Sequence, residues 1–152
     1  MAKRVIKVII ALAVALCSCG IFVAADCDLS HKHYLNDYGV CRSCQEDKAV
    51  LLTLNENGEY KSDEVTIDVY NDTIIKFVSN GEKGIELKIN CESEGVKTVT
   101  LLSDTTAYIP INKNYQTGNY VSEIQFVKGE TYYVKISFSS VKTASFIISG
   151  LN

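Results

Sequence analysis

The chain has no tryptophan, one proline and one methionine among its 152 residues. It has no HExxH or GxSxG motif, and its two histidines, His31 and His33, lie close together. Because an enzyme needs reactive groups beyond its metal ligands, this scarcity favours a non-catalytic role. The missing tryptophan also removes the indole platform on which many sugar-binding surfaces stack a ring.

The shortage of proline accompanies a strand-like pattern from residue 48 to residue 152, with no helical period. Apolar and polar residues alternate along Val65–Val69, Ile85–Cys91 and Tyr132–Phe138, which predicts strands with one buried face and one wet face. Turn signals such as Asn57-Gly58 recur at short intervals. We therefore expect an all-β domain of eight or nine strands, an antiparallel β-sandwich of jelly-roll kind, at residues 48–152.

Long hydrophobic runs are absent except at the start, where residues 1–25 have the layout of a signal peptide. Three basic residues precede an uncharged run, and Val23-Ala24-Ala25 suits a signal peptidase, which predicts a mature start at Asp26 and a secreted or surface-associated protein. Two alternatives stay open. The run is long enough to remain as a membrane anchor, and Leu16-Cys17-Ser18-Cys19 resembles a bacterial lipobox that would place a lipid on Cys19.

Acidic residues are absent from the first 25 positions, which hold three of the 15 basic residues and none of the 18 acidic ones. The mature chain therefore carries 12 basic and 18 acidic residues, a formal net charge of −6. Since binding of nucleic-acid phosphates needs a basic surface, we expect no nucleic-acid partner.

Residues 26–47 concentrate the cysteines and histidines of the mature chain. Thiolates and imidazoles at this spacing predict a zinc-binding knot, with candidate ligands at Cys27, His31, His33, Cys41 and Cys44. A segment too short for its own core would gain its order from the metal. The alternative is disulfide bonding, because four cysteines in an exported chain allow three pairings. A thioredoxin-like CxxC is disfavoured, because strands rather than a βαβ unit follow it.

The knot resembles a short segment of many Gram-positive extracellular proteins: C-x-H, an aromatic, a few polar residues, then G-x-C-x-x-C-G. The matching residues here run from Cys27 through His33-Tyr34 to Gly39-Val40-Cys41-Arg42-Ser43-Cys44. Gln45 replaces the last glycine, and Cys27 stands farther from His33 than in the pattern. The resemblance implies a zinc module and favours His33 over His31 as the fourth ligand. Structural zinc is favoured over a zinc-dependent hydrolase, because a catalytic site needs an open position and a base.

A second resemblance covers Phe126–Ile136, which contains Lys128-Gly129-Glu130-Thr131-Tyr132-Tyr133, and the closing run Ala144–Ile148. These residues look like the last strands of the bacterial pre-peptidase C-terminal domain. The resemblance implies a non-catalytic accessory β-sandwich, in some relatives bound to calcium and engaging polysaccharide or fibrous protein. Acidic residues at Glu46-Asp47, Asp63-Glu64, Asp68 and Asp72 are candidate calcium ligands if loops gather them.

The polar stretch from Ser103 to Tyr120 carries three tyrosines, Tyr108, Tyr115 and Tyr120. A tyrosine offers a flat apolar face and a hydroxyl, which suits sugar rings or extended peptides, so these residues form a candidate ligand site. The alternative is packing on strand surfaces. Together these patterns predict a secreted, non-catalytic binding or structural module with a glycan or extracellular-protein ligand. A disulfide-stabilised secreted inhibitor or effector without metal is the further alternative.

Overall fold

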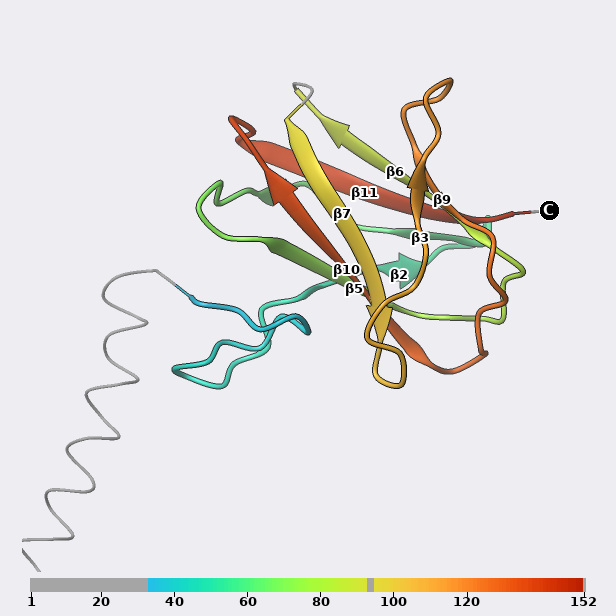
Figure 1. Cartoon of the computed structure of the whole chain (residues 1–152), viewed down its shortest axis with the longest axis horizontal. Helices are drawn as coiled ribbons and strands as arrows, with labels where there is room; N and C mark the ends of the chain where they lie inside the picture. Colours follow the sequence, from blue (N-terminus) through green and yellow to red (C-terminus); the bar gives the residue numbers. More distant parts are fainter. Residues whose placement is uncertain (1–32, 93–94, 152) are drawn as a thin grey trace, which may run out of the picture.

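Two layers of strands make up the body of the protein in the computed structural model, which describes residues 33–92 and 95–151 (Figure 1). These residues form eleven strands and no helix, so this part of the chain has no helical membrane span. The strands are β1 (Val50–Leu51), β2 (Thr53–Leu54), β3 (Glu59–Lys61), β4 (Val65–Thr66), β5 (Thr73–Val78), β6 (Ile85–Cys91), β7 (Val96–Ser103), β8 (Asn112–Lys113), β9 (Tyr120–Ser122), β10 (Thr131–Phe138) and β11 (Thr143–Gly150).

The smaller sheet has four strands in the order β1-β5-β10-β7, and the larger has seven, in the order β2-β3-β11-β6-β9-β8 with β4 also paired to β11. In the larger sheet β11 lies between β3 and β6, with Phe146 opposite Ile89. In the smaller sheet β10 lies between β5 and β7, with Val134 opposite both Ile75 and Leu101. The last two strands in chain order are therefore central strands of the two sheets.

The core lies between the two sheets because each central strand turns alternate apolar side chains inward. Along β10, Tyr132, Val134, Ile136 and Phe138 are buried, and the residues between them are only partly covered. Rings fill much of this space, with Phe126 and Tyr132 4.7 Å apart between centroids. The all-β sandwich predicted from alternation is confirmed.

Three details differ from the expectation. First, β1 pairs with β5 in parallel, so the smaller sheet is mixed. Second, the described residues form more strands than predicted, because several are only two residues long. Third, the alternation at Val65–Val69 yields only the short strand β4, since Asp68 ends the extended run by accepting hydrogen bonds within its own turn.

Candidate metal site

Residues 33–48, here called the N-terminal segment, form two small overlapping loops beside the smaller sheet (Figure 1). Leu35 pairs with Cys41 and Val40 pairs with Asp47, each as an isolated antiparallel bridge. The first loop is held from inside, because the Asn36 side-chain carbonyl accepts hydrogen bonds from the backbone N–H groups of Tyr38 and Val40, both at 3.0 Å. Short polar side chains and turns thus supply the order that a hydrophobic core would otherwise give.

Two residues with positive φ shape these loops: Gly39 in the first, and Gln45 in the second, which contains the CxxC turn. Gly39 has a φ of 79°, and a Cβ there would lie 2.6 Å from Cβ of Ala49, so only glycine fits. Gln45 has a φ of 62° and donates its backbone N–H to the Cys41 carbonyl at 2.9 Å. The turn therefore keeps the left-handed residue after the second cysteine even though glutamine replaces glycine.

His33, Cys41 and Cys44 meet at one point. Their ligand atoms all lie within 4.8 Å of one another, and Nδ1 of His33 is 3.6 Å from Sγ of Cys44. Two ligands of one tetrahedral zinc, with Zn–S near 2.3 Å and Zn–N near 2.0 Å, stand roughly 3.5 Å apart. Within residues 33–92 and 95–151 this is the single group of three or more histidine, cysteine or acidic side chains close enough to share a metal.

The electrostatic surroundings favour the metal-binding form of Cys41. Hydrogen bonding lowers the pKa of this thiol from 9.0 to about 6, chiefly from the backbone N–H of Cys44, with the ring of His33 and the N–H of Ser43 adding to the effect. Burial of Cys41 opposes the shift, because it raises the pKa. The thiolate is the form that binds a metal, so the lowered pKa favours the state of Cys41 that ligation needs.

The cluster is fastened to the sandwich on the outer face of the smaller sheet. Asp37 contacts Lys135 of β10, with Oδ1 and Nζ 2.8 Å apart, and Asp47 forms an ion pair with Lys76 of β5. Tyr38 packs edge-on against Tyr133, with ring centroids 5.1 Å apart. These contacts fix the position of the metal cluster relative to the sheet.

Of the five predicted metal ligands, the structure brings together His33, Cys41 and Cys44. Cys27 and His31 lie outside the described residues, as do the signal peptide and Cys19. The predicted calcium ligands do not converge within the described chain. Most already have protein partners: Glu46 pairs with Lys48, Asp47 with Lys76, Asp72 with Lys135, and Asp68 closes its own turn.

The three predicted ligand-binding tyrosines lie at three positions from the end of β7 to the start of β9 and differ in exposure. Tyr108, 66% exposed, follows β7, and Tyr115, 92% exposed, stands at the turn between β8 and β9. Tyr120 begins β9, and burial raises its pKa. It lines a hollow of about 440 Å³ with Cys91 and Asn119. The ligand role of these tyrosines remains a prediction.

Sequence reasoning missed two tyrosines beside the metal cluster. Tyr34 is 63% exposed and Tyr70 is 92% exposed, and both border the hollows where the N-terminal segment meets the loop of residues 67–72. The available signal was the run Asp68-Val69-Tyr70-Asn71-Asp72, whose polar residues are typical of a turn and place Tyr70 at its tip.

Comparison with known proteins finds similar solved structures but no family. No protein-family model and no curated protein matches the chain. The periplasmic inhibitor PliG of g-type lysozyme from Aeromonas hydrophila superimposes with a TM-score of 0.49 at 11% identity, covering 66% of this chain and 94% of its own. PliG from Salmonella Typhimurium gives 0.42 at 15% identity, covering 67% and 97%. Likeness at this level shows no family and assigns no function.

Proposed function

We propose that this protein is an exported, non-catalytic binding module whose N-terminal segment is held in shape by a structural zinc ion. The observation that carries the proposal is the convergence of His33, Cys41 and Cys44 within 4.8 Å. Three side chains that bind soft divalent cations converge on a segment of 16 residues that has no core of its own.

The donor set favours zinc over the harder cations. Two sulfurs and one imidazole nitrogen are the ligands of structural zinc sites, whereas calcium and magnesium take oxygen ligands. In the proposal, a fourth ligand comes from Cys27, or from His31, and closes the tetrahedron. A closed tetrahedron leaves no position for a reactive water, which distinguishes this site from that of a zinc hydrolase.

The surroundings of the cluster fit a structural role better than a catalytic one. A candidate base beside the cluster is Glu46, which interacts with Cys44, and its carboxylate forms an ion pair with Lys48 at 2.5 Å. Both effects of Lys48, a hydrogen bond and its charge, keep the pKa of Glu46 below its ordinary value. A general base works best with a pKa near the working pH, so Glu46 is tuned in the wrong direction.

The metal is tested on mature protein purified without a reducing agent or added zinc. We expect about one equivalent of zinc per chain by elemental analysis, and a four-coordinate thiolate spectrum when cobalt replaces it. Cys44→Ser and Cys27→Ser should each lower the metal content, whereas Cys91→Ser, on β6 away from the cluster, should not. A zinc-free chain with a disulfide between Cys41 and Cys44 would replace the proposal with the inhibitor or effector alternative.

Export is tested separately by mass spectrometry of the mature N-terminus. A start at Asp26 supports a secreted or surface-associated protein, and a lipid on Cys19 supports a membrane-anchored one. A cytoplasmic protein that still carries residues 1–25 would contradict export. The resemblance to the pre-peptidase C-terminal domain lies in β10, in the residues before it and in β11. It supports the proposal that the sandwich is an accessory module.

The ligand of the module is proposed to be an extracellular glycan or protein. Binding of the mature chain to glycans and to extracellular proteins, including a g-type lysozyme, provides the test, with Tyr108→Ala, Tyr115→Ala and Tyr120→Ala as variants. Loss of binding in these variants supports a ligand site in the stretch from Ser103 to Tyr120. Binding that is indifferent to all three excludes it as the ligand site.

A further inference from the structure

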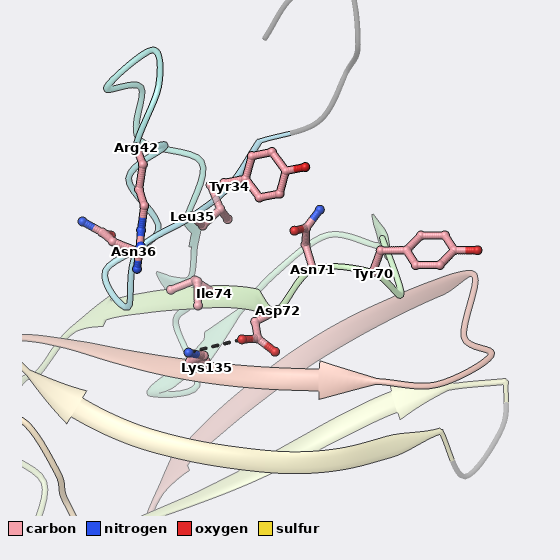
Figure 2. A pocket seen from close by; sticks show the side chains of 9 residues that line it. All are labelled: Tyr34, Leu35, Asn36, Arg42, Tyr70, Asn71, Asp72, Ile74 and Lys135. Atoms are coloured by element: carbon pink, nitrogen blue, oxygen red, sulfur yellow. Dashed lines mark ion pairs between the residues drawn. The ribbon is translucent and has the colours of Figure 1, made fainter.

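A groove separates the N-terminal segment from the loop of residues 67–72, above strands β5 and β10 (Figure 2). Its first hollow has a volume of about 240 Å³ and is bordered by Tyr34, Asn36, Arg42, Tyr70, Asn71 and Lys135. A second hollow of about 260 Å³ shares Leu35, Asn71, Asp72 and Ile74 with it. The shared lining makes the two hollows one elongated depression rather than a single closed pocket.

The floor of the groove depends on the N-terminal segment. Ile74 lies opposite Lys135 in the sheet and next to the inward-facing Ile75, so it belongs to the outer face, yet it is only 1% exposed. Figure 2 shows it between the sheet and the N-terminal segment, near Leu35. The segment therefore covers an apolar patch of the sheet and at the same time forms one wall of the groove.

The opposite wall is built as a rigid turn. The Asp68 carboxylate accepts the backbone N–H of Tyr70 at 3.0 Å and the side-chain amide of Asn71 at 2.7 Å. The turn holds Tyr70 in a position where its ring is 92% exposed. Tyr70 lines the depression, and a tyrosine ring beside a hollow offers a flat apolar face on which a ligand can stack.

The charges within the groove largely cancel. Lys135 pairs with both Asp37 and Asp72, at 2.8 and 3.2 Å, so its ammonium is already neutralised. Arg42 adds one positive charge near Asp37, and Asp68 adds one negative charge at the far wall. A phosphate or a strongly charged peptide would therefore gain little here, whereas an uncharged polar ligand would meet amide, guanidinium and carboxylate groups that hydrogen-bond hydroxyls.

We infer that this groove binds a short oligosaccharide of neutral sugars, with rings stacked on Tyr70 and Tyr34 and hydroxyls bonded by Asn36, Asn71 and Arg42. The inference deepens the binding function proposed above and rests on it. The elongated shape fits a chain of sugar units rather than a single small molecule.

Calorimetry with the zinc-loaded mature chain and four probes, cellotetraose, chitotetraose, mannotetraose and xylotetraose, tests the inference. We expect at least one to bind, and Tyr70→Ala to weaken it roughly tenfold or more, as truncation of an aromatic anchor does. Tyr70→Phe keeps the ring and should retain most of the affinity. Val127→Ala is the control, because Val127 is an apolar side chain that is 58% exposed and does not line the groove, and it should leave the affinity unchanged.

Several results overturn the inference: no binding of any of the four probes, binding indifferent to Tyr70→Ala, or an equal loss of binding in Val127→Ala. If Tyr70→Ala instead removes binding of an immobilised extracellular protein and no sugar binds, the groove is a protein site. Metal analysis of each sample separates the two proposals. If zinc-free protein binds sugar through Tyr70, only the zinc proposal is refuted. If zinc-loaded protein binds no sugar, only the groove proposal is refuted.

Discussion

Nζ of Lys135 lies 2.8 Å from Oδ1 of Asp37, which joins the central strand of the smaller sheet to a segment 98 residues earlier. The same ammonium reaches Asp72 at 3.2 Å, so one lysine holds both walls of the groove. The N-terminal segment is thus attached by ion pairs in addition to its cover over Ile74 and the packing of Tyr38 on Tyr133.

Replacing Lys135 tests this attachment. Lys135→Met should weaken docking of the segment by about 0.5–1 kcal/mol, the range for partly exposed ion pairs, and the effect should shrink at high salt. Faster amide hydrogen exchange in residues 34–48, with unchanged exchange in β11, is the measurement. Lys142→Met changes an exposed lysine elsewhere and serves as the control. Equal exchange in both variants would show that the pair contributes nothing.

The pH dependence of docking follows from the same pair. The hydrogen bond and charge of Lys135 hold the pKa of Asp37 below its ordinary value, and Asp37 raises the pKa of Lys135. The Asp37 contribution is therefore complete above about pH 4 and is lost as pH falls through the lowered pKa. The Lys135 contribution is complete below about pH 10 and is lost as pH rises through the raised pKa.

The measurement is hydrogen exchange of residues 34–48 between pH 5 and pH 3, corrected for intrinsic rates. Protection should fall across this range in the parent chain. In Lys135→Met the pKa of Asp37 loses its main cause of lowering, so the drop should be smaller. A drop of the same size in both proteins would assign it to another carboxylate.

Gly39 and Gly58 form a matched pair for testing the close approach beneath the CxxC turn. Their φ angles are 79° and 77°, but a Cβ at Gly58 meets nothing within 4 Å, whereas one at Gly39 meets Ala49 at 2.6 Å. Gly58→Ala should cost about 1 kcal/mol of unfolding free energy from backbone strain alone. Gly39→Ala should in addition displace the turn and lower zinc affinity, measured by competition with a chelator. Equal zinc affinity in the two variants would contradict the role assigned to the contact.

Gln45 and Ser140 are the described non-glycine residues with positive φ, at 62° and 59°. Glycine relieves strain of about 1 kcal/mol at such a position, so both Gln45→Gly and Ser140→Gly should resist urea slightly better or at least equally well. Only Gln45→Gly should also raise zinc affinity, because only Gln45 closes the CxxC turn. Zinc affinity unchanged by Gln45→Gly would show that the turn carries no strain relevant to the metal.

Tyr60 tests the polar network at one end of the core. Its hydroxyl donates to Glu82 at 2.6 Å and accepts the backbone N–H of Asn80 at 2.8 Å. Tyr60→Phe leaves both groups without this partner and should cost about 1–3 kcal/mol in urea unfolding. Tyr108→Phe, on an exposed ring, should cost nothing measurable. If Tyr60→Phe leaves the free energy of unfolding unchanged, water takes the place of the hydroxyl.

The sandwich was predictable because alternation along β6, β10 and β11 directly records which side chains face the core. The parallel pairing of β1 with β5 was not, since two-residue strands such as Val50–Leu51 leave no periodic trace. The convergence of His33, Cys41 and Cys44 was predictable, because a CxxC turn brings two sulfurs together and a histidine lies a short distance before it in the chain. The groove was not, because it depends on Asp37 finding Lys135, a contact between distant residues that no local pattern encodes.

The position of β11 between β3 and β6 sets an order of events during biosynthesis. A ribosome makes β3 and β6 long before Thr143–Gly150, so neither can acquire its central neighbour while the chain is growing. Under the export proposed above, this delay would help the chain pass a secretion channel, because the larger sheet cannot form completely until β11 has been made.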